Sequence, residues 1–439
     1  MTAFAVDWST RVLPSGVRLV AVPQPHLHRA HVAAYVRVGS RFEDEKTNGL
    51  SHFLEHMIYR GTERLRSAHA VNYAFERLGG SLYAATQVDY GVFSVSLPPE
   101  NFDEAVSLFA EVLAEPAFHD VGIEQGIVCE EILEDLDDEG RQVDADNLSR
   151  ELIYPDHPLG YPITGDEARV RSFDEIALRR HHESHYRGAG VVVVASGALA
   201  GANAQSAGAR AVDRLEASFG RVPPGERLPA VPPPRSQKKP RMRIVENVSS
   251  QTELRVCLRG IPETDPDRPA LDVFMRLVDD GMSTRLYHRI CDAQGLCYDV
   301  SAAYDGYEDD GVIDFAAGTQ HQRTAKVARE ILGMVEELAR EGPTDEELEK
   351  VRARHRWELS SMRDSAEELA GFYAGGPLFD RFETLDDRLA RTVAVTRDDV
   401  VRVAKRIAEP SRLNVVAVGL LDKGEDKRLA DVAKGWKGA

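Results

Sequence analysis

The stretch Thr47-Asn-Gly-Leu-Ser-His-Phe-Leu-Glu-His-Met-Ile-Tyr-Arg-Gly61 decides both the fold and the chemistry expected of this chain. Its apolar residues recur at helical intervals, at Leu50, Phe53, Leu54, Met57 and Ile58. That spacing predicts an α-helix with one apolar face. We expect Thr47 or Asn48 to cap the start of this helix and Gly61 to follow its end.

The other face of the predicted helix carries His52, Glu55 and His56. The two histidines are four residues apart, so their imidazoles lie one turn apart on the same side, where they can hold one Zn²⁺. Glu55 is offset from His56 by about 100°, so it can reach a water beside the ion without binding the ion. The pattern His-x-x-Glu-His is the inverted zinc-peptidase motif. A solvated helix face with no metal is the alternative interpretation.

A zinc peptidase needs a third protein ligand and one open position for water. Residues 120–139 predict an acidic helix in which Glu124 and Glu131 are seven positions apart. These two residues therefore lie nearly on one line along the helix. The other acidic residues of the segment favour a solvated face, and spacing alone does not select the ligand.

Length and composition exclude several classes of protein. The chain has 439 residues, with 54 Lys and Arg against 72 Asp and Glu, for a net charge of −18. Such a chain is a poor partner for nucleic acid or an anionic membrane. Four cysteines in 439 residues exclude a disulfide scaffold, and the absence of a CxxC pair argues against a thiolate zinc ribbon. Residues 1–16 show no signal-peptide pattern and no apolar run approaches 20 residues, so we expect a cytoplasmic protein that does not bind membranes.

The chain is predicted to form two domains. Residues 222–240 hold seven prolines and show no periodicity, which predicts an extended linker between residues 1–221 and 241–439. Each half begins with alternating strands followed by a helix and ends with a buried strand, at 191–195 and 413–418. The predicted fold class is therefore α+β, with a duplicated domain. Two unrelated α+β domains are the alternative.

The motif helix together with Glu131 resembles the pitrilysin/insulinase-like (M16) family of zinc peptidases, which includes relatives of mitochondrial processing peptidase. The similarity covers most of the chain, in family order, at residues 61–62, 78–82, 115–118, 130–132, 157–160, 163–165, 185–187, 281–286 and 295–298. The resemblance implies two duplicated metallopeptidase-type α/β roll domains, with 1–221 as the catalytic domain. As in the short bacterial branch of the family, it also implies a dimer that encloses a chamber.

The resemblance also assigns roles at the site. It implies one Zn²⁺ per chain held by His52, His56 and Glu131, with Glu124 orienting the ligands. Glu55 is then the general base of a zinc-dependent endopeptidase that hydrolyses peptides or unfolded segments. The resemblance implies that the peptide adds as a strand along residues 81–86. The implied substrate-binding residues are Ser81, Leu82, Tyr83, Ala84 and Tyr298.

Two departures from the family pattern affect the substrate residues. The family usually has Asn-Ala where this chain has Tyr83-Ala84, which leaves main-chain pairing possible. Tyr298 matches a family tyrosine, but Cys291 stands where the family has arginine, and Arg289 lies two positions away. We therefore expect a heterodimer in which this chain bears the metal and a related subunit supplies the Arg/Tyr pair. A homodimer that uses other groups is the alternative.

Two other functions compete with a general endopeptidase. A non-catalytic assembly or scaffold subunit of the same fold is one, although such relatives usually lose the metal motif that is intact here. A dedicated maturase that trims one precursor peptide is the other.

Overall fold

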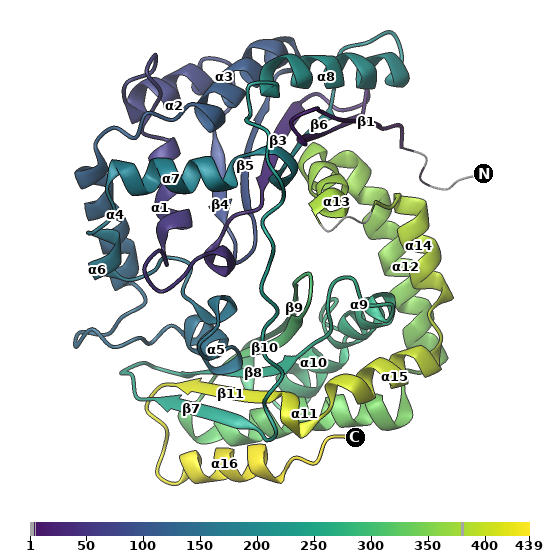
Figure 1. The fold of residues 1–439 in the computed structure, drawn as a ribbon. Coiled ribbons are helices and arrows are strands. Elements are labelled where there is room, and N and C mark those ends of the chain that lie inside the picture. The colour runs from purple at the N-terminus through teal and green to yellow at the C-terminus, as the bar shows by residue number, and fades with distance from the viewer. Residues whose placement is uncertain (1–3, 5, 379–381) are drawn as a thin grey trace. The chain divides into compact units, whose positions relative to one another are not determined.

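A computed structural model describes residue 4 and residues 6–378 and 382–439 (Figure 1). The chain divides into two compact units that interleave along the sequence. Unit 1 comprises Met1–Ile132, Tyr161–Ala230 and Trp357–Arg388, and unit 2 comprises Leu133–Gly160, Val231–Arg356 and Leu389–Ala439. Each unit contains a sheet covered by helices, so the predicted α+β class is confirmed.

The sheet of unit 1 has the strand order β1-β2-β6-β3-β5-β4. Its strands are β1 (Ser9–Val12), β2 (Arg18–Pro23), β3 (Ala30–Val36), β4 (Tyr83–Thr86), β5 (Gly91–Leu97) and β6 (Val191–Gly197). Its helices are α1 (Leu50–Ile58), α2 (Ala68–Glu76), α3 (Phe102–Ala114), α4 (Val121–Leu133), α6 (Glu167–Val170), α7 (Glu175–His185), α8 (Ala204–Phe219) and α13 (Ala366–Leu378). Strand β6, an unbroken run of small and β-branched residues, is buried along its whole length, as expected of a strand covered on both faces.

The sheet of unit 2 has the order β7-β11-β8-β10-β9. Its strands are β7 (Arg241–Val245), β8 (Thr252–Arg259), β9 (Cys297–Gly306), β10 (Gly311–Thr319) and β11 (Leu413–Val418). Its helices, two of which (α12 and α14) run across the unit boundary, are α5 (Ala145–Ile153), α9 (Arg268–Val278), α10 (Arg285–Tyr287), α11 (Thr324–Glu341), α12 (Asp345–Ser361), α14 (Leu385–Ala394), α15 (Arg397–Ile407) and α16 (Glu425–Gly435).

The two sheets repeat one topology. The order β2-β6-β3-β5-β4 corresponds strand for strand to β7-β11-β8-β10-β9. In each sheet the first of these pairs is parallel, β2 with β6 and β7 with β11, and the other pairs are antiparallel. This agreement supports a duplicated domain over two unrelated ones.

Each unit takes one helix from the opposite half of the sequence. Helix α13 packs on β6 and β3 of unit 1, and α5 packs on β11 and β8 of unit 2. The predicted domains, 1–221 and 241–439, are each continuous in sequence. The two units are defined by contacts, and each combines segments from both halves of the chain, so the domain boundaries remain a prediction. The predicted linker, 222–240, contains neither helix nor strand.

Helix α1 has the apolar face that its spacing predicts. The side chains at Leu50, Phe53, Leu54, Met57 and Ile58 are all buried. The helix packs against α7 and β4, which leaves its histidine-bearing face toward α4. Within the described parts of the chain, we find no helix that combines the length and the apolar character needed to cross a bilayer.

Candidate metal centre and active site

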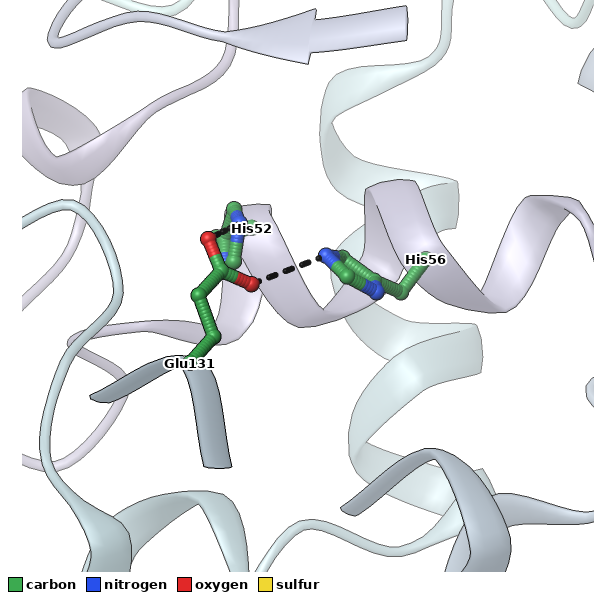
Figure 2. A group of neighbouring side chains, drawn as sticks. All are labelled: His52, His56 and Glu131. Carbon is green, nitrogen blue, oxygen red and sulfur yellow. Dashed lines mark ion pairs between the residues drawn. The ribbon is translucent and has the colours of Figure 1, made fainter. Parts of the chain in front are cut away.

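Two histidines of α1 and one glutamate of α4 converge on a single point (Figure 2). Nε2 of His52 lies 3.4 Å from Oε1 of Glu131, and Nε2 of His56 lies 3.5 Å from Oε2 of the same carboxylate. The two imidazole rings meet edge to face with their centroids 4.7 Å apart. The structure therefore brings together the two motif histidines and one of the two glutamates that the spacing left open.

The residues of this cluster fit a zinc ion. Zinc binds imidazole nitrogen and carboxylate oxygen at about 2.0–2.2 Å, which places neighbouring ligand atoms of a tetrahedral site about 3.3 Å apart. The two measured separations between nitrogen and oxygen are close to that value, and all three ligand atoms lie within 4.8 Å of one another. In the described residues, no other group of three or more His, Cys, Asp or Glu side chains is arranged to hold a metal.

Glu124 lies behind His56, on the side of the ring away from Glu131. Its Oε1 is 2.9 Å from Nδ1 of His56, and its other oxygen accepts a hydrogen bond from Arg60. Burial disfavours the charged form of His56, but the hydrogen bonds to Glu124 and Glu131 outweigh burial and raise its pKa to about 9. The pKa of Glu124 is lowered, because the hydrogen bonds from His56 and Arg60 outweigh its desolvation. A carboxylate in this position fixes the ring and orients Nε2 toward an ion.

Glu131 is held ionised by the two histidines. The hydrogen bond with His52, followed by that with His56, lowers the pKa of Glu131 against a smaller opposing effect of burial. Its side chain is 42% exposed, so one side of the cluster stays open to solvent. Nδ1 of His52 is buried and has no hydrogen-bond partner among the described residues, so the ring is oriented by packing and by the contact of its Nε2 with Glu131.

The start of α1 differs from the prediction that Thr47 or Asn48 caps it. The residue before the helix is Gly49, in the left-handed conformation at φ 94°, and no side chain of its own caps the helix. A Cβ at Gly49 would lie 2.7 Å from the carbonyl oxygen of Thr164. Glycine is therefore required there, because a side chain would clash with this oxygen and would strain the left-handed backbone. The capping acceptor is instead the buried carboxylate of Glu43, which accepts the N–H of Gly49 at 2.9 Å. Sequence reasoning missed this residue because it lies outside the usual capping positions.

Glu55 lies beside the edge of the sheet. Its Oε2 accepts a hydrogen bond of 2.5 Å from the hydroxyl of Thr86, the last residue of β4. One turn further along α1, the hydroxyl of Tyr59 donates to the carbonyl oxygen of Leu82 at 3.2 Å. The first bond attaches α1 to β4, and the second joins Tyr59, just after α1, to Leu82, just before β4. Thr86 ends the edge segment expected to pair with the substrate, residues 81–86, but its bond to Glu55 was not predicted.

The predicted substrate segment lies at the edge of the unit 1 sheet. Strand β4 is the last strand in the order and pairs with β5 alone among the described strands. Ser81 is exposed, Leu82 is 9% exposed, Tyr83 is 59% exposed and Ala84 is half-buried. The backbone of β4 therefore has a free side on which an extended chain can pair.

Tyr298 lies in unit 2 at the start of β9 and is 91% exposed. Cys291 lies on a π-helical turn with its Sγ 4.0 Å from Sγ of Cys297. The side chain of Arg289 is bound to the carboxylates of Glu330 and Glu337, at 2.7 and 3.0 Å. Arg289 is therefore engaged within its own unit.

Comparison with known proteins agrees with this architecture. Residues 18–167 match the family described as Insulinase (Peptidase family M16), and residues 173–354 match the Peptidase M16 inactive domain. The chain belongs to the M16 peptidase family, as its resemblance predicted. The first of these matches contains the whole metal cluster, and the second contains Tyr298.

Curated relatives are similar over nearly their full length. A protein of Streptomyces coelicolor named an uncharacterized zinc protease is 27% identical over 438 residues, covering 95% of this chain and 91% of that protein. A Bacillus subtilis protein, the uncharacterized zinc protease YmxG, is 26% identical over 398 residues, covering 90% of this chain and 94% of that protein.

Solved structures share the fold. A protease from Helicobacter pylori superposes with a TM-score of 0.86 at 20% identity, covering 94% of this chain and all of that one. A structure from Pseudomonas fluorescens, described as a peptidase M16 inactive domain, gives a TM-score of 0.84 at 20% identity. The match covers 95% of this chain and 99% of that one.

Proposed function

We propose that this chain is the metal-bearing subunit of a zinc-dependent endopeptidase that hydrolyses peptides or unfolded segments. The observation that carries the proposal is the convergence of His52, His56 and Glu131 at ligand separations of 3.4 and 3.5 Å. The names of the curated relatives agree with zinc as the metal. When bound, a zinc ion supplies a Lewis acid that polarises the scissile carbonyl and acidifies a water molecule.

Glu55 is the proposed general base. It follows His52 by three residues and precedes His56 by one, so its carboxylate lies on the metal-binding side of α1 without being one of the converging ligands. The carboxylate takes a proton from the attacking water and transfers it to the leaving amine. The hydroxyl of Thr86 holds one carboxylate oxygen, which leaves the other to accept that proton.

The peptide is proposed to bind as an added strand on the free edge of β4, along Ser81 to Ala84. Main-chain pairing of this kind requires no particular side chains, so Tyr83 in place of the family asparagine is compatible with it. The bond between Thr86 and Glu55 then places the end of the pairing edge next to the base. An extended substrate would thereby present one peptide bond to the cluster.

The partner is proposed to be a related subunit. Cys291 stands where the family has a substrate-binding arginine, and Arg289 is occupied by Glu330 and Glu337. A thiol provides no positive charge for the developing oxyanion. A heterodimer enclosing a chamber, in which the partner contributes the Arg/Tyr pair, supplies this charge. A homodimer using other groups is the alternative arrangement, and a precursor maturase would use the same chemistry on one substrate.

The experiment compares zinc-loaded wild type, Glu55→Gln and the exposed control Glu63→Gln in cleavage of quenched fluorescent peptides, with and without a co-expressed related subunit. We expect Glu55→Gln to lower kcat by a factor of about 10² to 10⁴ while zinc content is unchanged, and Glu63→Gln to match wild type. Unchanged turnover in Glu55→Gln would reject Glu55 as the base. Equal rates for the lone chain and the pair would reject the heterodimer. A zinc-loaded chain that cleaves nothing in either state would favour the scaffold function.

A further inference from the structure

The chain just before the exposed Tyr298 brings two thiols close together. Sγ of Cys291 lies 4.0 Å from Sγ of Cys297, which is six residues later in the sequence. Both side chains are half-buried, so a small molecule in solvent can reach them. A disulfide has an S–S length of about 2.05 Å, so the two sulfur atoms need to approach by about 2 Å to form one. Rotation of both side chains about their Cα–Cβ bonds supplies a movement of this size.

The backbone holds the two cysteines in place relative to each other. Cys291 lies on the π-helical turn His288–Asp292, and Cys297 is the first residue of β9. The N–H of Leu296 donates to the carbonyl oxygen of Ile290 at 2.9 Å, and these two residues each adjoin one of the cysteines. The side chains of Ile290 and Leu296 are buried in the core of unit 2. Both ends of the segment are therefore anchored, and the residues between the cysteines are exposed on the surface.

The two thiols differ in acidity. Burial raises the pKa of both, and it raises that of Cys297 to about 12. The interaction with Cys291 raises the pKa of Cys297 further, whereas the hydrogen bond with Cys297 partly offsets burial at Cys291. The thiolate is the nucleophile in thiol–disulfide exchange. Cys291 is therefore expected to react first with an external disulfide, and Cys297 is expected to displace the external group.

Negative charge around the pair favours an uncharged oxidant. The charge of Asp299 adds to burial in raising the pKa of both thiols. Asp292 follows Cys291 directly, and its carboxylate is exposed, with Nδ1 of His288 at 2.9 Å. An anionic disulfide such as glutathione disulfide is repelled by these carboxylates. A neutral disulfide of low molecular weight meets no such repulsion.

We propose that Cys291 and Cys297 form a site of reversible disulfide formation. The thiolate of Cys291 attacks one sulfur of a small disulfide, which forms a mixed disulfide and releases one thiolate. The thiolate of Cys297 then attacks Sγ of Cys291 and releases the second thiolate. The two thiol protons pass to the released thiolates, so the protein loses two electrons and the small disulfide is reduced to two thiols. The new bond closes residues 291–297 into a ring that ends directly before Tyr298.

The first measurement is the equilibrium constant of the bond. Full-length zinc-loaded protein is equilibrated with mixtures of 2-mercaptoethanol and its disulfide, alkylated with iodoacetamide and digested with trypsin. Both cysteines fall in one tryptic peptide, Ile290 to Arg323, so the bond appears in its mass as a loss of two hydrogen atoms. We expect the constant to be at least about tenfold larger in the folded protein than in the same chain in urea, because the fold holds the thiols together.

Single variants test the order of attack. Cys297→Ser should accumulate a mixed disulfide with 2-mercaptoethanol at Cys291, because it has no second thiol to displace the external group. Cys291→Ser should react about tenfold more slowly than Cys297→Ser, because its remaining thiol is the less acidic one. Cys257→Ser replaces a buried thiol of β8 by a hydroxyl that can still donate to Asp314, and it should match wild type.

The bond should also restrain the chain before Tyr298. Amide hydrogen exchange of the residues between Cys291 and Cys297, followed by mass spectrometry, should be slower in the oxidised protein than in the reduced protein. Equal exchange in the two forms would show that the bond does not restrain this segment.

Three results would overturn the site. One is an equilibrium constant that is no larger in the folded protein than in urea. Another is wild-type protein that keeps both thiols free, or keeps a stable mixed disulfide, at the highest fraction of external disulfide. The third is faster reaction of Cys291→Ser than of Cys297→Ser, which would reverse the roles of the two thiols. The comparison in urea needs only the wild-type chain, so it decides the matter even where a variant does not fold. None of these results depends on the metal ligands, which belong to unit 1.

Discussion

The carboxylate of Glu43 accepts the backbone N–H of Ser51 at 2.7 Å, within the first turn of the helix that carries both histidines. The same carboxyl group accepts the N–H of Gly49 and the side-chain amide of Asn48, so one buried group satisfies three donors. Burial raises the pKa of Glu43, and these hydrogen bonds oppose that shift. A hydrogen-bond acceptor at a helix start pairs N–H groups that have no partner within the helix. Ser51, one of these donors, directly precedes the metal-site residue His52.

Glu43→Gln should therefore destabilise the protein. The amide group of glutamine would direct N–H hydrogens at backbone donors, and at least one donor would remain unpaired. We expect the free energy of unfolding in urea to fall by about 2 kcal/mol. The exposed neighbour Glu45 offers a matched control, and Glu45→Gln should change the unfolding free energy by less than about 0.5 kcal/mol. Equal effects of the two substitutions would contradict the capping role.

The adjacent pair Glu130 and Glu131 allows a direct test of the third ligand. Glu131→Gln removes the carboxylate that contacts both histidines, so zinc content measured by elemental analysis should fall from one ion per chain to nearly none. Glu130→Gln changes the same charge one position away, on an exposed side chain, and should retain the ion. Loss of zinc in Glu130→Gln alone would invalidate the assigned ligand.

Glu124→Gln tests the contact behind His56. The substitution weakens the hydrogen bond that orients this ring and leaves Arg60 without its carboxylate. Zinc affinity, measured by competition with a chelator, should decrease by a factor of about 10 to 100. Glu134→Gln, on an exposed position after the same helix, provides the comparison. A change of less than twofold in Glu124→Gln would show that Glu124 does not support the ligand.

His31 predicts how stability depends on pH. Burial lowers its pKa from 6.5 to about 4, so between these values the unfolded chain binds a proton that the folded protein does not. The contribution of this residue is fully present above pH 6.5 and is lost as the pH falls toward 4, by up to about 3 kcal/mol. In His31→Asn the unfolding free energy should fall less steeply over this window. If the unfolding free energies of wild type and His31→Asn fell equally with pH over this window, the lowered pKa of His31 would be refuted.

The sequence predicted those features that depend on short intervals. Helical spacing identified the apolar face of α1, and the four-residue interval placed His52 and His56 together. The choice of Glu131 came from the family resemblance, because the position of α4 against α1 is a tertiary relationship that spacing does not encode. Glu43 and the bond between Thr86 and Glu55 were missed for a similar reason. Each acts through a contact with α1 that no local pattern records.

The exchange of α5 and α13 has a consequence for how the gene can be divided. A fragment ending at the proline-rich segment would encode β6 and β3 but lack α13, the helix that packs on them, and the complementary fragment would lack α5. Each fragment would expose apolar strand surface and aggregate on its own. Co-expression of the two fragments would supply both missing helices. Each duplicated half therefore depends on the other to complete its fold.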